Sequence, residues 1–129
     1  SSLQNELKSA IEKAEVEADF YVAQYASATL PRLCIANNSE YVVYYLDGTT
    51  VYKLTGKYPG NASTPANKIE AVKKAKTTGG SSVCEDVTSF FVDTSKRSSG
   101  QIAIKIRSGS SDVKTTNVTV KAAETQATE

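Results

Sequence analysis

The sequence predicts an α+β fold in which a long N-terminal amphipathic helix packs on an antiparallel β-sheet. Residues 2–29 contain neither Gly nor Pro and are rich in residues that favour helices, such as Ala, Glu and Leu. Beyond residue 31, short alternating or β-branched runs separated by turn residues are typical of antiparallel strands. We therefore expect one domain, with the helix over 1–30, the sheet and its polar loops over 31–121, and a flexible tail over 122–129.

The predicted helix carries one apolar stripe, because its apolar residues recur every three or four positions. The residues of this stripe are Leu3, Leu7, Ile11, Ala14, Ala18 and Val22. The helix would be about 40 Å long at 1.5 Å per residue and would end before Pro31. Because a helix of this length exceeds the span of a small sheet, we expect its first turns to extend beyond the domain and to leave part of the stripe without an intramolecular partner.

The strands and the second helix follow in order along the chain. A type I′ turn centred on Asp47-Gly48 is expected to join the most clearly predicted hairpin, because both central positions of that turn need a positive φ. A loop rich in Pro, Gly and Asn precedes residues 66–76, which fit either a short helix or an irregular strand. The predicted strands span 32–35, 41–46, 49–54, 88–92, 101–107 and 113–121.

Composition excludes several classes of function. The chain has no His, so the commonest general base and zinc ligand is missing. A formal net charge of +1 is too small to hold a phosphate backbone, so no nucleic acid is expected as a partner. The carboxylates of Glu12, Asp19, Glu85 and Asp86 fit a solvated surface better than an acid–base pair or a cation site. We therefore expect no catalysis, no cofactor and no metal.

The two cysteines, Cys34 and Cys84, are too few for a zinc site without His and do not form a Cys-x-x-Cys pair. They predict one structural disulfide, which would close a loop of about 50 residues and stabilise the fold by ~4 kcal/mol in the chain-entropy model. Such a bridge is typical of an oxidising compartment outside the cytosol. The alternative is two buried thiols.

Four tyrosines form a candidate contact surface in the predicted hairpin, namely Tyr41, Tyr44, Tyr45 and Tyr52. Alternation places Tyr44 on one face of the sheet and Tyr41 and Tyr45 on the other, so a single core cannot cover them all. Either one face is exposed for a partner, or the helices cover both faces.

This layout resembles the soluble domain of the type IV pilin and pseudopilin superfamily. The resemblance is carried by the helix free of Gly and Pro, the break at Pro31, and the strands that include Leu33-Cys34-Ile35 and residues 41–47. It implies a pilin-like fold preceded by an apolar segment that spans the inner membrane before assembly. The absence of Met and the Ser1-Ser2 start are what a trimmed or processed chain would show.

The resemblance further implies a structural role in an extracellular or periplasmic filament. The apolar stripe of the helix would pack against copies of this chain or related pilin subunits, and the sheet domain would be presented at the surface for adhesion, motility, DNA uptake or secretion. The alternative function is a secreted binding module, such as a cystatin-like inhibitor or an adhesin, which has the same order of helix and strands. The Gln-x-Val-x-Gly loop of cystatins does not occur in this sequence.

Overall fold

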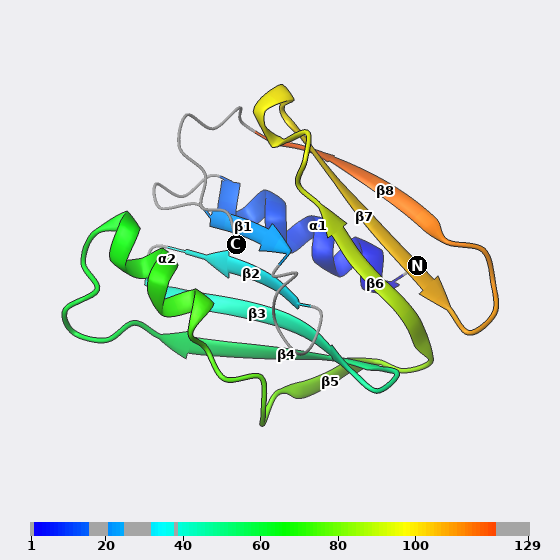
Figure 1. Cartoon of the computed structure of the whole chain (residues 1–129), viewed down its shortest axis with the longest axis horizontal. Coiled ribbons are helices and arrows are strands. Elements are labelled where there is room, and N and C mark those ends of the chain that lie inside the picture. Colours follow the sequence, from blue (N-terminus) through cyan, green and yellow to red (C-terminus); the bar gives the residue numbers. More distant parts are fainter. Residues whose placement is uncertain (1, 16–20, 25–31, 38, 121–129) are drawn as a thin grey trace.

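The computed structural model describes residues 2–15, 21–24, 32–37 and 39–120, and it contains two antiparallel sheets (Figure 1). The first sheet has the strand order β1-β2-β3-β4-β5, with β1 (Tyr21–Gln24), β2 (Arg32–Ala36), β3 (Glu40–Asp47), β4 (Thr50–Lys57) and β5 (Ser81–Cys84). The second has the order β6-β7-β8, with β6 (Val87–Asp93), β7 (Gln101–Ser108) and β8 (Lys114–Thr119). The helices are α1 (Ser2–Glu15), α2 (Pro65–Lys73) and the 3-10 turn η1 (Arg97–Ser99).

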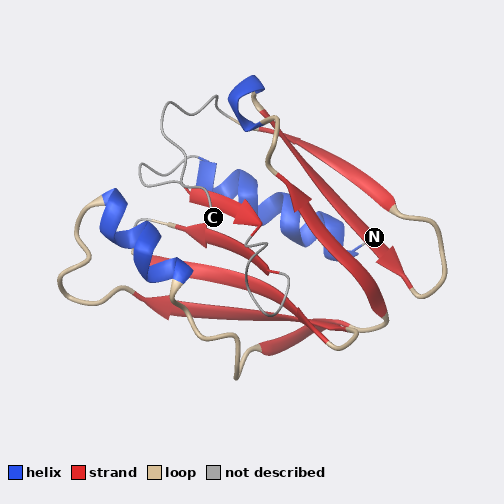
Figure 2. Ribbon diagram, viewed as in Figure 1, coloured by secondary structure: helices blue, strands red, loops and turns tan. Residues whose placement is uncertain are grey.

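The predicted fold class, a long helix on one antiparallel sheet, is wrong. Strands dominate the described chain (Figure 2), α1 has only 14 residues, and the stretch Tyr21–Gln24 is a strand where the helix was expected to continue. The physical reason is pairing with β2, in which Val22 lies opposite Ile35 and Ala23 opposite Cys34. A β-branched and an aromatic residue in Tyr-Val-Ala-Gln favour a strand once a partner edge is present.

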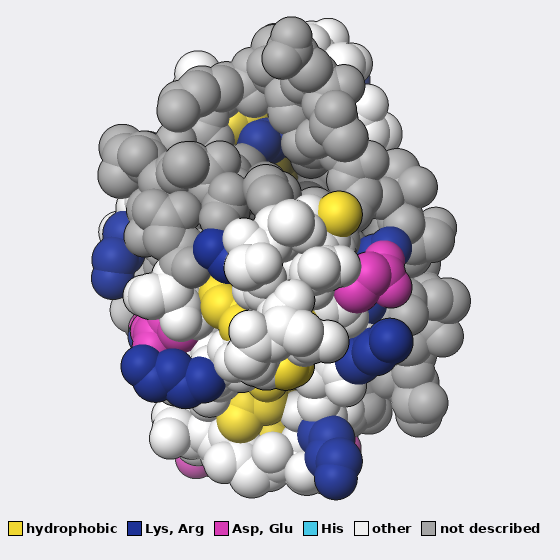
Figure 3. All heavy atoms as spheres, turned by 90° about the vertical axis from the view of Figure 1, so that its left-hand side faces the viewer, with side chains coloured by type: hydrophobic (Ala, Val, Ile, Leu, Met, Phe, Trp, Pro, Cys, Tyr) yellow, Lys and Arg dark blue, Asp and Glu magenta, His cyan; other side chains and the backbone are white. Residues whose placement is uncertain are grey.

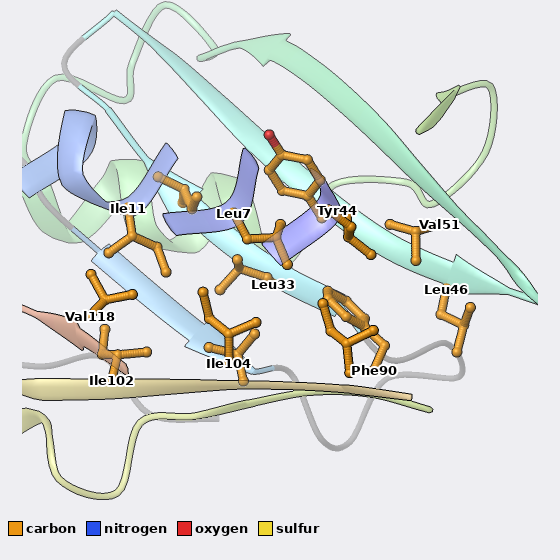
Figure 4. Close-up of a cluster of buried hydrophobic side chains, with 14 of the residues drawn as sticks. Leu7, Ile11, Leu33, Tyr44, Leu46, Val51, Phe90, Ile102, Ile104 and Val118 are labelled. Atoms are coloured by element: carbon orange, nitrogen blue, oxygen red, sulfur yellow. The ribbon is translucent and has the colours of Figure 1, made fainter. Parts of the chain in front are cut away.

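The main core lies between α1 and the inner faces of both sheets. From α1 it includes Leu7 and Ile11, which Figure 4 shows beside Leu33 of the first sheet and Ile104 and Val118 of the second. Each fully buried Leu or Ile side chain contributes about 1.5–3 kcal/mol. A 14-residue helix is marginal by itself in water, so this burial is the main source of its stability.

A second, smaller core covers the outer face of the first sheet beneath α2. Its buried members are Cys34, Ala36, Val43, Tyr45, Val72 and Ala75. Thr64 caps the N-terminus of α2 by accepting a hydrogen bond from the Asn67 N–H. At the other end of α2, the buried Arg32 guanidinium of β2 donates to the carbonyls of Ala75 (2.8 Å) and Lys73 (3.2 Å). Because β3 is buried on both faces, its sequence is a continuous apolar and aromatic run.

The predicted hairpin is confirmed, but its turn differs by one residue. Asp47 pairs with Thr50, so the two loop residues are Gly48 and Thr49 and the predicted Asp47-Gly48 pair is wrong. Gly48 has a φ of 65° at the first central position, as in a type II′ turn. The short helix within 66–76 is confirmed as α2.

Candidate functional site

The candidate functional site is a groove of about 380 Å³ between α1 and strands β2, β3 and β4. Pockets of this size, with an apolar floor and a few convergent polar groups, are typical of ligand sites. The groove is lined by Glu6, Ser9, Ala10 and Lys13 of α1 and by Ile35, Asn37, Glu40, Val42, Tyr44, Lys53 and Thr55 from the sheet side. We call it the α1 groove.

Strand register explains why these sheet residues share one face. Val42 lies opposite both Ile35 and Thr55, and Tyr44 lies opposite Lys53, so side chains from three strands form two adjacent rows across the sheet. Residues that differ by two positions along a strand point to the same face. The two rows face α1, and the intervening Val43 and Tyr45 point to the outer core.

Tyr44 and Glu6 form one end of the α1 groove. The Tyr44 hydroxyl donates to Glu6 Oε2 at 2.9 Å, and Lys53 Nζ lies 5.9 Å from the centre of the Tyr44 ring. Burial, the hydrogen bond to Glu6 and the Glu6 charge together raise the pKa of Tyr44 well above its ordinary value. Tyr44 is therefore a neutral donor at physiological pH, and one Glu6 oxygen is committed to it.

Asn37 forms the other end, in the turn between β2 and β3. Its N–H donates to the Glu40 carbonyl at 3.0 Å, and its own carbonyl accepts from the Tyr58 hydroxyl at 2.5 Å. The residue is only 8% exposed, yet its side-chain Oδ1 is buried with no hydrogen-bond partner in the part of the chain that the structure describes. A buried acceptor without a donor is costly, so such an atom requires an explanation.

The formal charge along the α1 groove is balanced. Glu6 and Glu40 contribute two carboxylates, and Lys13 and Lys53 contribute two ammonium groups. Between the ends the sheet floor is apolar, formed by Ile35 and Val42, and Ala10 contributes an apolar side chain from α1. The arrangement suits non-covalent binding of a ligand that carries both signs of charge.

The predicted filament-packing stripe is divided by the structure. Leu3, Leu7 and Ile11 are at most 2% exposed and lie in the main core of the same chain. The expectation that the first helical turns extend beyond the domain is therefore wrong. Val22 is in strand β1 rather than in the helix. Ala18 and the Ala14 side chain lie outside the described residues.

The predicted disulfide is not formed, and Cys34 and Cys84 are both thiols. Cys34 is on β2 and Cys84 is on β5, so β3 and β4 lie between them. Three strand spacings amount to about 14 Å, whereas bridged Cα atoms are at most about 6.8 Å apart. The two side chains also belong to different cores, because Cys34 is in the outer core and Cys84 packs against the main core.

The four tyrosines do not form one exposed surface. Tyr44 is in the main core, whereas Tyr45 is buried in the outer core and Tyr41 and Tyr52 pack against it, which confirms the alternation of faces. Tyr45 stacks on Tyr52 with ring centres 5.3 Å apart, and its hydroxyl accepts from the Gly80 N–H at 3.0 Å. Tyr44 and Tyr45 are thus buried on opposite faces of the sheet, and Tyr41 and Tyr52 are partly buried.

The other charged candidates lie at the surface. Glu12, Glu85 and Asp86 are exposed, and Asp19 lies outside the described residues. Within the described ranges, no three carboxylate or thiol side chains are grouped as a metal site would require. Basic side chains on the face shown in Figure 3 are interspersed with uncharged ones and do not form a single patch.

Sequence reasoning missed Asn37, Glu6 and Lys53 as site residues. Asn37 belongs to the polar run Asn37-Asn38-Ser39, and no local pattern indicates that its side chain is buried. Glu6 and Lys53 are far apart in the sequence, and packing of α1 on the sheet brings Glu6 to Tyr44 while pairing of β4 with β3 brings Lys53 there.

Comparison of the chain with family models, with characterised proteins and with solved structures finds no match. No helix among the described residues is long and apolar enough to cross a membrane. The class of protein must therefore be argued from the α1 groove and from the way α1 is held.

Proposed function

We propose that this chain is the globular domain of a pilin-like structural subunit, from a type IV pilus or a related pseudopilus filament. In this proposal the N-terminal helix connects the domain to an apolar segment that anchors it in the inner membrane before assembly. The partners are copies of the chain or related subunits, the assembled location is an extracellular or periplasmic filament, and the role is structural rather than enzymatic.

The proposal rests on the order of the elements, a helix near the start of the chain followed by antiparallel strands, and the attachment of α1 to both sheets is a departure from the protruding helix expected of such a subunit. Leu3, Leu7 and Ile11 insert between the sheets, and the two α1 side chains nearest to Leu3 and Leu7 add polar contacts. Gln4 Nε2 donates to the Lys114 carbonyl of β8 at 2.9 Å, while Glu6 accepts from Tyr44 of β3.

The buried stripe changes how subunits would pack. The apolar side of α1 is already covered within one copy. Contacts between copies would therefore be made by the exposed polar side of α1 and by the proposed apolar segment. Among residues 2–13 of α1, the exposed ones are Ser2, Asn5, Ser9, Glu12 and Lys13. A polar helix face gives weak association, so the apolar segment supplies most of the assembly energy in this proposal.

The test is the sequence of the precursor upstream of Ser1, combined with localisation in the source cell. The expected result is a short basic leader followed by about 20 apolar residues that run into α1. Antibodies against the domain would then label filaments in a sheared surface fraction by electron microscopy. A cleavable signal peptide that ends at Ser1, with a freely secreted monomer, would overturn the proposal.

A second candidate function, a secreted binding module of the cystatin-like or adhesin type, is favoured by one observation. The α1 groove combines an apolar floor with a balanced set of charges. A freely secreted precursor would favour this second function over the filament role. Tight binding of a protease or of a surface receptor to the secreted chain would then support it.

A further inference from the structure

The two sheets end in the edge strands β1, β5, β6 and β8 within the described part of the chain, and these edges differ in regularity. β1 and β5 have four residues each. The pairing of β6 with β7 shifts register between Val87 and Ser89. β8 pairs with β7 over six residues without a shift, contains no Pro, and has one charged residue, Lys114 at its first position. Short length, bulges, Pro and charge keep an edge strand from pairing with another chain, so β8 is the least protected of the four.

The backbone of β8 presents unpaired hydrogen-bonding groups along its outer side. The Val120 N–H donates to the Gly100 carbonyl at 2.9 Å, which places every second residue from Val120 back to Lys114 in the hydrogen-bonded pairs with β7. The N–H and carbonyl groups of Thr115, Asn117 and Thr119 therefore point away from β7. Within the described ranges no strand pairs with this side of β8, which lies at the margin of the molecule in Figure 1. This row of donors and acceptors matches a further antiparallel strand.

A second copy of β8 satisfies this edge in one particular register. Two-fold symmetry requires one residue to lie opposite itself, because opposed residues of antiparallel strands have side chains on the same face of the sheet. With Asn117 opposite Asn117 of the second copy, Thr115 lies opposite Thr119, and about six backbone hydrogen bonds join the two strands. A pair centred on Thr116 would instead leave Thr119 opposite Val113, which lies outside β8.

The same register brings compatible side chains together. Lys114 lies opposite Val120 of the second copy, so the only charges of the two strands are not opposed. On the outer face the two exposed Asn117 amides meet, and on the inner face Thr116 meets the buried Val118, which continues the apolar side of the sheet. Polar and β-branched pairs of this kind are favourable between strands. The edge is therefore complementary to itself, as a two-fold contact requires.

We propose that two copies of this chain associate through β8, antiparallel and centred on Asn117, so that their three-stranded sheets form one continuous sheet. The inference goes beyond the structural role proposed above and does not rest on it. A two-fold contact closes on itself and joins only two copies, whereas a filament needs contacts that repeat. Association of the isolated chain can therefore succeed or fail whatever the result for the filament.

The experiment is sedimentation equilibrium of the chain between about 5 μM and 1 mM. A contact limited to one strand is smaller than a standard interface, so we expect a reversible dimer with a Kd on the order of 100 μM. Asn117→Pro removes an N–H that points away from β7 and should weaken the dimer by at least about tenfold. Asn117→Ala keeps that N–H and is the matched control, with a Kd within about threefold of the unmodified chain. A monomer at every concentration, or unchanged association of Asn117→Pro, would overturn the proposal.

A charge pair tests the register independently of the proline variant. Asn117 is exposed, so Asn117→Lys and Asn117→Glu leave the core intact. Each variant alone places like charges opposite each other and should dimerise about fivefold more weakly, whereas an equimolar mixture pairs opposite charges and should associate at least as tightly as the unmodified chain. The same two substitutions at Asn61, an exposed residue of the loop before α2, are the control and should change nothing. If the mixture associates no better than the single variants, the register centred on Asn117 is wrong.

Discussion

Leu7 is the residue on which the packing of α1 can be tested most directly. It is fully buried and lies in the main core between Leu33 of the first sheet and Ile104 of the second (Figure 4). Leu7→Ala removes a buried branched side chain and leaves a cavity that two flanking sheets cannot close. Substitutions of this kind cost about 3 kcal/mol. With an m-value of about 2 kcal/mol/M, the urea midpoint should fall by about 1.5 M.

The assay is urea unfolding followed by circular dichroism, with Asn5→Ala as the matched control on the exposed side of the same helix. Asn5 is exposed, and Ala is the better helix former, so the control should be unchanged or slightly more stable. A loss below about 1 kcal/mol for Leu7→Ala would refute the reasoning. It would mean that α1 is not part of the core of one copy, and that the stripe is available to other subunits after all.

Three further predictions test other parts of the structure. Iodoacetamide should modify Cys84 in the folded chain but Cys34 only after unfolding, and mass spectrometry would show the difference. A fall in Tm on adding a reductant would instead indicate a disulfide. Gly48→Ala should cost about 1 kcal/mol in urea unfolding, because φ is 65° while no atom lies within 4 Å of the added Cβ; an unchanged midpoint would contradict the turn assignment. The raised pKa of Tyr44 contributes stability that is fully present below the ordinary value of 10.0 and is lost as the pH rises above it, since the unfolded chain then releases the proton first. Unfolding midpoints measured between pH 8 and 11 should therefore fall less steeply for Tyr44→Phe than for the unmodified chain, and parallel profiles would contradict the burial of this hydroxyl.

Local sequence patterns were sufficient to predict some of the strands and to indicate a possible second helix. The strand over 101–107 is β7, and its alternate residues Ile102, Ile104 and Ile106 are buried as a half-covered strand requires. For residues 66–76 the sequence left a short helix and an irregular strand open, and the structure has the helix α2 (Pro65–Lys73), which begins after a Thr cap with Pro in its first turn. For β7 alone do the period of the apolar residues and the turn residues at both ends point to one structure.

The second sheet could not be predicted in the same way. Whether a strand joins one sheet or another depends on which edges meet, and alternation does not encode that choice. The stretch Tyr21–Gln24 shows the difficulty, because its residues continue the three-and-four spacing of the helix and also fit a strand. Pairing with β2 decides the outcome, and β2 lies beyond Pro31 in the sequence.

The α1 groove could not be predicted from the sequence for a related reason. Its walls come from α1, β2, β3 and β4. Its distinctive atom is the buried Asn37 Oδ1, in a turn held by the bond from the Asn37 N–H to the Glu40 carbonyl and by the bond from the Tyr58 hydroxyl to the Asn37 carbonyl. In the sequence the same Asn belongs to a polar turn, where a solvated side chain is the ordinary expectation. A buried polar atom without a donor lowers stability, and Leu at position 37 would avoid that cost in the free chain. Urea unfolding of Asn37→Leu should therefore show a gain in stability, and a loss would mean that the Asn37 side chain makes a favourable contact in the folded chain.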